Sequence, residues 1–526
     1  MAQRKAAGWL AGIAMAIALA LGMTGAAWAL DQGSTGTLTL DGLEEGATAK
    51  AYKVIDVSWD EAADQPQEPV YTWNVAVSAW VKDKYPDYIG ADGSVTEKFN
   101  NDNAKAFYDA LSGAIAKGDP LVSEAAKETV PQGQTGLDLT LPMGGYLVNV
   151  ASGSGMYVYQ PIAHNVVPEF IDGAWRVANP SVKVDVKRSE LSIDKKVSNG
   201  DSGEKEFVGA QYGDTVNYDV RVLIPEYPDN ATNKLFSVAD KLSDGLTFEK
   251  DSLKVYGVAG DGTETLLANG EFFTVEYDGA YQDNSGTFTF RVKFNYDKLF
   301  AEGYESVHLD YNAVVNTDAV IGETGNPNEA KLEFTNDPFD EDGYKTDTDE
   351  VTVYSYGIDV LKVGEDGTTP LAGAEFSLSE KADGSDPMQF VREGDGVYHV
   401  YALDKDGANA QKTTALIVSA DGKLQIKGLN EGVYYLTETK APEGYNKPSG
   451  SVEIEVKDAD AGGALDGNVE GQGSAPSGFV HQEIQNSKGF NLPTTGGIGT
   501  VGITAVGVAV MAFAAFMLLR TRKSNR

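Results

Sequence analysis

Two lysines in this sequence occupy positions in predicted β-strands from which their side chains would point toward a hydrophobic core. Segment 191–197 places Lys195 on the face that carries its apolar residues, and segment 358–364 does the same for Lys362. By the same parity, Lys196 faces solvent. A lysine buried without a partner loses its proton, because desolvation disfavours the charged form. A neutral buried amine is a nucleophile, so the pattern predicts two nucleophilic lysines.

A second kind of chemistry is indicated by the last 36 residues. A pentapeptide, Leu492-Pro-Thr-Thr-Gly496, precedes an uncharged apolar run of 23 residues, 497–519, and a basic tail, 520–526. The run is long enough to span a membrane as a helix, and the basic tail predicts that its end stays in the cytoplasm. Pro493 favours an extended backbone that an enzyme groove can hold. We therefore expect everything before the run to lie outside the cell.

The N-terminus predicts export by its own pattern. Arg4 and Lys5 precede an apolar stretch, and Ala27-Trp-Ala29 offers a cleavage site, so residues 1–29 are predicted to be a signal peptide. The exported chain has no cysteine, which excludes disulfides as its covalent support. Its net charge of −36 argues against nucleic acid as a partner.

The C-terminal arrangement resembles the cell-wall sorting signal of Gram-positive surface proteins. In that family a membrane sortase cuts between the threonine and the glycine, holds the threonine as a thioester and passes it to an amine. The resemblance implies cleavage between Thr495 and Gly496, within a recognition sequence of Leu492, Pro493, Thr494, Thr495 and Gly496. An ordinary membrane anchor at the chain's end is the alternative.

Short segments of alternating apolar and polar residues occupy the middle of the chain. Examples are 215–223, 287–294 and 451–456, each bounded by Gly, Asp, Asn or Pro. This pattern predicts β-sandwiches in which each sheet has one solvated face. Helical spacing appears in one segment, 103–117. We predict an all-β chain of tandem immunoglobulin-like sandwiches, similar to the Cna A/B type, with a small helical insertion in the first.

The stretch 179–187 alternates cleanly and turns Lys183 and Lys187 toward water. Its position resembles the pilin motif of sortase-assembled backbone pilins, in which a lysine at the end of the N-terminal domain attacks the next subunit's thioester. The resemblance implies that Lys187 is this acceptor. The commoner form of the motif has Tyr-Pro before the lysine, whereas Asp185-Val186 stands here. Lys183 therefore remains the alternative acceptor.

Fimbrial domains of this kind are joined internally by a spontaneous Lys–Asn isopeptide bond, formed beside a buried, protonated acid. For Lys195, segment 236–246 matches the family's acid segment and implies Asp240. The asparagine is expected near the strand 328–336. Parity does not separate Asn328 from Asn336, and the resemblance favours Asn328, whose spacing from Asp240 better suits the family.

The last part of the chain carries a complete second set. Segment 435–445 matches the pilin E-box, in which Glu438 is the acid, and Asn486 ends the last strand before the sorting signal. With Lys362, these residues imply a second isopeptide bond. No cofactor and no metal site is expected, because the four histidines are scattered and the acidic turns lack calcium-loop spacing.

The resemblance to a backbone (major) pilin covers nearly the whole chain and implies five segments. These are the signal peptide 1–29, an N-terminal pilin domain 30–187, an isopeptide-forming sandwich 188–350, a Cna B-type sandwich 351–490, and the sorting signal, span and tail 491–526. The implied product is a covalent fibre at the cell wall, with transient membrane anchoring through 497–519. The resemblance implies no enzymatic turnover.

The implied partners are a class C-type pilin sortase, a housekeeping sortase, identical subunits head to tail, minor pilins and peptidoglycan. Host or matrix ligands are left open. The alternative function is a wall-anchored or tip adhesin of similar domain composition, and a wall-bound enzyme ranks last because the first domain offers no catalytic cluster.

Overall fold

The computed structural model describes residues 30–171, 173–200, 203–227, 231–277, 279–284, 286–336, 343–459, 465–488 and 511. The predicted signal peptide, the sorting pentapeptide and nearly all of the predicted span lie outside these residues. Within them, no helix is long and apolar enough to cross a membrane. The chain divides into two compact units: Met1–Val208 with Thr215–Val314 and Asn326–Thr352, and Gly209–Asp214 with Val315–Gly325 and Val353–Arg526.

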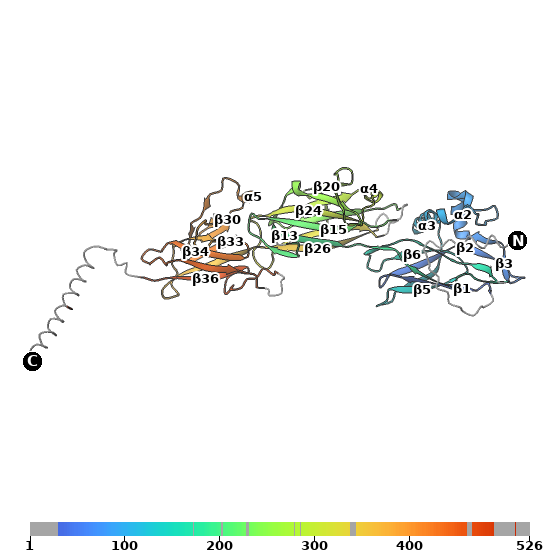
Figure 1. Ribbon diagram of the computed structural model, residues 1–526, viewed down its shortest axis with the longest axis horizontal. Coiled ribbons are helices and arrows are strands. Elements are labelled where there is room, and N and C mark those ends of the chain that lie inside the picture. Colours follow the sequence, from blue (N-terminus) through green and yellow to red (C-terminus); the bar gives the residue numbers. More distant parts are fainter. Residues whose placement is uncertain are drawn as a thin grey trace, which may run out of the picture. The chain divides into compact units, whose positions relative to one another are not determined.

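The first unit begins with two sheets (Figure 1). They share a hydrophobic core. The three-stranded sheet has the order β11-β1-β5, and the five-stranded sheet has the order β3-β2-β6-β8 with β4 paired to β2. Their bounds are β1 Thr35–Asp41, β2 Thr48–Asp60, β3 Gln65–Trp73, β4 Glu124–Thr129, β5 Gly136–Pro142, β6 Gly144–Ala151, β8 Ile162–Val166 and β11 Ser181–Asp185. Short pairs flank them: β7 Tyr157–Tyr159 with β12 Arg188–Glu190, and β9 Pro168–Ile171 with β10 Ala174–Val177.

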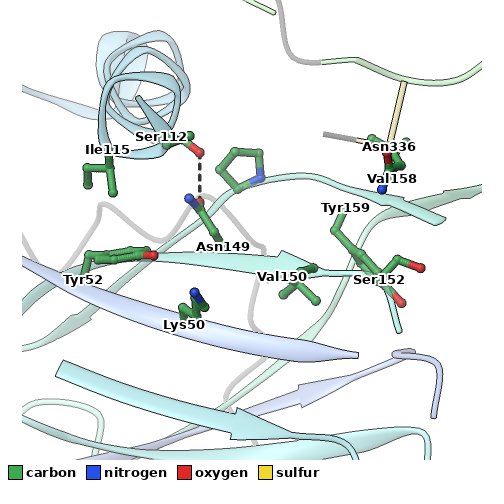
Figure 2. A pocket seen from close by; sticks show the side chains of 13 residues that line it. Lys50, Tyr52, Ser112, Ile115, Asn149, Val150, Ser152, Val158, Tyr159 and Asn336 are labelled. Carbon is green, nitrogen blue, oxygen red and sulfur yellow. Dashed lines mark hydrogen bonds between the residues drawn. The ribbon is translucent and has the colours of Figure 1, made fainter. Parts of the chain in front are cut away.

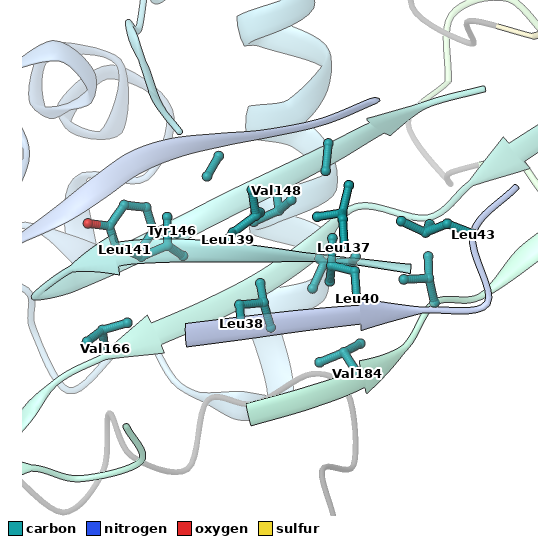
Figure 3. Close-up of a cluster of buried hydrophobic side chains, with 14 of the residues drawn as sticks. Leu38, Leu40, Leu43, Leu137, Leu139, Leu141, Tyr146, Val148, Val166 and Val184 are labelled. Carbon is teal, nitrogen blue, oxygen red and sulfur yellow. The ribbon is translucent and has the colours of Figure 1, made fainter. Parts of the chain in front are cut away.

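Strand alternation places apolar side chains of both sheets against each other. Leu38 on β1 and Leu139 on β5 pack with Tyr146 and Val148 on β6 (Figure 3). The intervening Leu147 of β6 belongs to a different apolar cluster on the opposite face. The five-stranded sheet is therefore buried on both sides, which accounts for its dense apolar sequence.

The second face of that sheet is covered by helices α2 (Val75–Lys84) and α3 (Asn101–Ala116), with a short 3-10 turn, Pro86–Tyr88, between them. Helix α3 agrees with the predicted helix 103–117 within two residues. Helix α2 was not predicted, so the expectation of a single helical segment is wrong. Its Val-rich sequence favours a strand by propensity. The side chain of Asn74 caps it by accepting a hydrogen bond from the backbone N–H of Ala76 at 3.0 Å.

The rest of the first unit is built on two six-stranded sheets. One has the order β13-β15-β24-β18-β19, with β17 paired to β24, and the other has the order β14-β26-β25-β16-β23-β20. Their bounds are β13 Ile193–Asn199, β14 Phe207–Gly209, β15 Thr215–Leu223, β16 Phe236–Leu242, β17 Leu246–Phe248, β18 Lys254–Val258, β19 Glu264–Leu266, β20 Phe273–Tyr277, β23 Phe290–Phe294, β24 Ser306–Val315, β25 Asn326–Thr335 and β26 Tyr344–Tyr354. Smaller elements are β21 Gln282–Asp283, β22 Gly286–Thr287, helix α4 Tyr296–Ala301 and the 3-10 turn Lys250–Ser252.

The second unit is a smaller two-sheet structure. Its sheets have the orders β31-β29-β30-β33-β27-β36 and β32-β28-β34-β35. The bounds are β27 Tyr356–Gly364, β28 Glu375–Ser379, β29 Phe390–Gly394, β30 Val397–Val400, α5 Leu403–Asp406, β31 Lys412–Thr413, β32 Leu416–Ile417, β33 Lys423–Leu429, β34 Gly432–Lys440, β35 Ser451–Val456 and β36 Phe479–Asn486. The first strand β27 and the last strand β36 are parallel neighbours. The all-β expectation is confirmed.

One buried histidine makes the folding stability of the first two sheets depend on pH. His164 on β8 is 6% exposed, and its Nε2 has no hydrogen-bond partner among the described residues. Desolvation lowers the pKa of His164 from 6.5 to about 4. Because the unfolded chain binds this proton more readily than the folded chain, the contribution of His164 to stability is complete above pH 6.5 and is lost as the pH falls toward 4. The pKa difference corresponds to about 3.5 kcal/mol, at about 1.4 kcal/mol for each pKa unit.

We predict that His164→Leu removes a large part of the acid destabilisation of these sheets between pH 6.5 and 4. Urea unfolding followed by tryptophan fluorescence measures this selectively, because the tryptophans beyond the predicted signal peptide are Trp59, Trp73, Trp80 and Trp175. An equal decline of stability in wild type and variant would assign the effect to carboxylates instead.

Candidate functional site

Four polar side chains meet at the centre of the two six-stranded sheets. Lys195 comes from β13, Asp240 from β16, Tyr311 from β24 and Asn328 from β25, and all four are fully buried. The Lys195 amine donates to Asp240 Oδ2 at 2.6 Å and to the Tyr311 hydroxyl at 2.9 Å. Asn328 Nδ2 donates to the same hydroxyl at 3.0 Å. The structure therefore brings the lysine, the acid and the favoured asparagine into one hydrogen-bonded cluster.

The strand register explains how these residues meet. Strands β16 and β25 are antiparallel neighbours that pair Leu242 with Asn328 and Asp240 with Ala330, so Asp240 and Asn328 lie near each other on one sheet. Lys195 and Tyr311 belong to the other sheet. The lysine side chain thus crosses the interior from one sheet to the other. Its burial agrees with the parity prediction, and Lys196 is partly exposed, as expected.

The cluster favours neutral forms of its lysine and its acid. Burial lowers the pKa of Lys195, although the nearby Asp240 opposes the shift, and burial raises the pKa of Asp240. Asp240 Oδ1 and Asn328 Oδ1 are both buried acceptors without a hydrogen-bond partner among the described residues. A proton on Asp240 Oδ1 would give the carboxyl group a donor there, while Oδ2 continues to accept from Lys195.

Tyr311 is the member of this cluster that the sequence did not predict. Its ring stacks on that of Tyr218 at 5.2 Å, and both rings are fully buried. Alternation in β24 indicates that Tyr311 points inward, but an inward tyrosine is ordinary core composition. The contacts of its hydroxyl depend on four strands that are distant in sequence, and only the fold brings these strands together.

The alternative asparagine lies elsewhere. Asn336 follows β25 and lines a hollow of about 400 Å³ together with Lys50, Tyr52 and Asn149 (Figure 2). Asn149 accepts a hydrogen bond from Ser112 there at 3.0 Å. Asn336 is not part of the buried cluster around Lys195.

A second cluster is buried in the C-terminal unit. Lys362 on β27, Glu438 on β34 and Asn486 on β36 are 0%, 4% and 1% exposed. The Lys362 amine donates to Asn486 Oδ1 and, at 3.2 Å, to the carbonyl of Ile484. Asn486 Nδ2 donates to Glu438 Oε1 at 2.7 Å, and Glu438 Oε2 lies 3.6 Å from the amine. All three residues of the predicted set are in direct contact.

The parallel pairing of β27 and β36 positions this cluster. Lys362 is paired with Ile484, and Gly364 is paired with Asn486, so the lysine and the asparagine lie near the same end of two adjacent strands. Glu438 reaches them from the other sheet. Burial lowers the pKa of Lys362, which favours the neutral amine.

The two candidate acceptor lysines differ in their surroundings. Lys187 is exposed between β11 and β12, and among the described residues it has no ion pair. Lys183 is also exposed, but its amine lies 2.7 Å from Asp41 Oδ2. The hydrogen bond and charge of Asp41 raise the pKa of Lys183 and hold its amine in the protonated form. Val184 and Val186 are buried, as the alternation predicts.

The described residues contain no group of three or more His, Asp or Glu side chains that could hold a metal ion. The sorting pentapeptide 492–496 lies outside the described residues. The candidate site residues that the structure does describe are therefore two buried lysine clusters, one in each unit, and an exposed lysine, Lys187, that follows β11.

Three family models match consecutive parts of the chain. A Gram-positive pilin backbone subunit 2, Cna-B-like domain matches residues 212–338. A prealbumin-like fold domain matches residues 357–471, and an LPXTG cell wall anchor motif matches residues 484–526.

Similar proteins agree with these matches. The trypsin-resistant surface T6 protein of Streptococcus pyogenes serotype M6 is 28% identical over 381 residues, which are 62% of this chain and 67% of that protein. Fimbrial subunit type 1 of Actinomyces viscosus is 25% identical over 465 residues, 78% of this chain and 80% of that protein. The solved T6 backbone pilin of Streptococcus pyogenes has a similar fold, with a TM-score of 0.57 at 20% identity over 88% of this chain and all of that one.

The chain therefore carries a Gram-positive pilin-backbone domain and a cell-wall anchor motif, and it is similar to backbone pilins, as expected of a wall-anchored protein of the cell surface. This confirms the predicted family and favours the backbone role over that of a tip adhesin.

The clusters themselves predict a stability effect. Asp240→Ala should destabilise the unit by about 3–5 kcal/mol, because it leaves the buried Lys195 amine without its acid. The double variant Lys195→Met with Asp240→Ala should be more stable than Asp240→Ala alone, since methionine fills similar space without an amine. Calorimetric unfolding of residues 30–488 compares the two. Equal free energies of unfolding in the single and the double variant would show that the buried Lys195 amine does not cause the destabilisation of Asp240→Ala.

Proposed function

We propose that this pilin is the shaft subunit of a covalently polymerised pilus, in which a sortase joins Thr495 of one subunit to Lys187 of the next. Internal Lys195–Asn328 and Lys362–Asn486 isopeptide bonds stabilise the subunit. Two fully buried lysine–acid–asparagine clusters in one chain support this function most strongly. Hydrophobic packing alone does not call for either set of three polar groups.

The C-terminal cluster has the groups that amide exchange needs. Glu438 in its protonated form donates to the Asn486 carbonyl oxygen once the side-chain amide is turned to face it. The neutral Lys362 amine attacks the amide carbon, a proton passes from the amine to the amide nitrogen, and ammonia leaves. The carboxyl group stabilises the charge that develops on the oxygen, and exclusion of water strengthens that hydrogen bond.

Lys187 is the better acceptor because, among the described residues, no carboxylate is paired with its amine, whereas Asp41 is paired with the amine of Lys183. A thioester is attacked by the neutral amine, and Asp41 opposes deprotonation of Lys183. Lys187 is exposed and can reach an enzyme-bound thioester of another subunit. We therefore retain Lys187 as the acceptor and Lys183 as the alternative.

The subunit would contain three folded domains, 30–187, 188–350 and 351–490, between the signal peptide and the sorting segment 491–526. Its expected partners are identical subunits, a pilin-class and a housekeeping sortase, minor pilins and peptidoglycan. The internal bonds make it a single-turnover reactant rather than an enzyme. We extend to it the trypsin resistance for which the streptococcal relative is named.

We predict that Lys187→Arg abolishes the polymer ladder on a denaturing gel of cell-wall extract while the monomer is still exported. Arginine keeps the positive charge but does not act as a nucleophile, because it stays protonated. Lys183→Arg is the matched control, and it should leave the ladder intact. Loss of the ladder in the control alone would transfer the acceptor role to Lys183.

We predict that residues 30–488 are lighter than their sequence mass by two ammonia molecules, and that Glu438→Gln is lighter by only one. Glutamine preserves the shape of the acid but has no carboxyl proton, and losing such a donor typically slows a reaction by about 10²–10³-fold. Tandem mass spectrometry of a tryptic digest should find the Lys362–Asn486 peptide pair in wild type and not in Glu438→Gln.

The exposed Glu453 on β35 offers a matched control for this variant. Glu453→Gln should retain both bonds. Survival of the Lys362–Asn486 pair in Glu438→Gln would make Glu438 a structural residue, and an unchanged wild-type mass would refute the internal bonds altogether.

A further inference from the structure

One hydroxyl group in the middle cluster contacts every group that reacts there. Tyr311 Oη lies 2.9 Å from the Lys195 amine, 3.0 Å from Asn328 Nδ2 and 2.5 Å from Asp240 Oδ2. The amine and the amide nitrogen both donate to this oxygen, which in turn donates to the acid. The attacking nitrogen and the leaving nitrogen are thereby bridged by a single atom.

Bond formation between these residues requires a proton to travel between the two nitrogens. The amine has one proton too many after it attacks the amide carbon, and the amide nitrogen needs one more before it leaves as ammonia. The cluster is fully buried, and bulk water has no access to either nitrogen. Asp240 Oδ2 already accepts from both Lys195 and Tyr311, so the hydroxyl group is the atom best placed between donor and acceptor.

We propose that Tyr311 is a catalytic residue of the middle-domain reaction, acting as a proton relay from the Lys195 amine to the Asn328 amide nitrogen. This inference rests on the Lys195–Asn328 bond proposed above. The Lys195 nitrogen forms a bond to the Asn328 side-chain carbon, and the carbonyl electron pair moves onto Oδ1.

The relay then balances the remaining protons. The Tyr311 hydroxyl turns from Asp240 to Asn328 Nδ2 and gives it a proton, while its oxygen takes one from the Lys195 nitrogen. The carbon–nitrogen bond of the amide breaks, its electron pair leaves with ammonia, and the carbonyl reforms. Tyr311 and Asp240 end in their starting protonation states.

The C-terminal cluster is arranged differently and provides a control in the same molecule. There the Glu438 carboxyl group itself lies against both reacting residues: Oε1 accepts from Asn486 at 2.7 Å, and Oε2 lies 3.6 Å from the Lys362 amine. Among the described contacts of that amine, none is to a tyrosine. A Tyr311 variant should therefore leave the Lys362–Asn486 bond unchanged.

The stacked neighbour of Tyr311 provides a matched variant. Tyr218 is equally buried, and its ring lies 5.2 Å from that of Tyr311. Its hydroxyl interacts with Asn328 but makes no hydrogen bond to Lys195 or Asp240 among the described residues, so it does not bridge the two nitrogens. Tyr218→Phe removes the same atom from the same stack without removing the bridge.

The test follows bond formation during cell-free synthesis of residues 30–488. Samples are quenched in denaturant at intervals, digested and analysed for the two crosslinked peptide pairs. We expect Tyr311→Phe to slow the Lys195–Asn328 bond by about 10²-fold, the lower end of the usual contribution of positioned proton transfer. Tyr218→Phe should match wild type, and the Lys362–Asn486 bond should form normally in all three proteins.

Each outcome separates the relay from the bond on which it depends. Absence of the Lys195–Asn328 pair from wild type would refute the bond, and the relay with it. A Tyr311→Phe protein that links at the wild-type rate, or a Tyr218→Phe protein that is slowed equally, would overturn the relay alone.

A second variant guards against misfolding of Tyr311→Phe. Site-specific 3-fluorotyrosine at position 311 keeps the ring and the hydroxyl group but makes the hydroxyl more acidic. A relay predicts an altered linking rate with a shifted pH profile. A wild-type rate and an unshifted pH profile would mean that the hydroxyl only fills space and positions its neighbours, which contradicts the relay.

Discussion

The structure depends on the cost of removing an amine from water. Lys195 and Lys362 are fully buried, and a charged ammonium group in that position is tolerated only beside an acid that compensates it. Each amine is accordingly in contact with a carboxyl group brought by a strand of the opposite sheet. Burial drives lysine toward its neutral form and Asp240 toward its protonated form, so the same desolvation that would destabilise a charged pair prepares a nucleophile and an acid.

The two clusters bring a buried lysine and an asparagine together through different strand arrangements. In the middle of the chain, the lysine and the asparagine belong to two sheets, whereas in the C-terminal unit they belong to adjacent parallel strands of one sheet. Each proposed bond closes a loop of more than a hundred residues, for which the chain-entropy estimate is about 5 kcal/mol of stabilisation. A chain without cysteine can thereby gain the kind of constraint that disulfides provide in other exported proteins.

Strand parity was sufficient to predict which lysines are buried, because alternation fixes the side of a sheet that a residue faces. It was insufficient for Tyr311, whose role depends on contacts among four strands distant in sequence. Helix α2 was missed because its valines favour a strand locally, while the cap at Asn74 and packing on the sheet decide the outcome. Asn328 and Asn336 share a parity, and only the folded register separates a buried residue from one beside a surface hollow.

The position of Lys187 at the end of the first domain has a consequence for the continuity of the fibre. If tension passes from Thr495 of one subunit into Lys187 of the next, it continues through residues 188–195, crosses to Asn328, runs to Lys362 and crosses again to Asn486. Residues 30–186 lie on a side branch of this covalent route. Proteolytic loss of the first domain from an assembled pilus, or a cut within either closed loop, would then leave the fibre unbroken, whereas a cut between Asn328 and Lys362 would sever it.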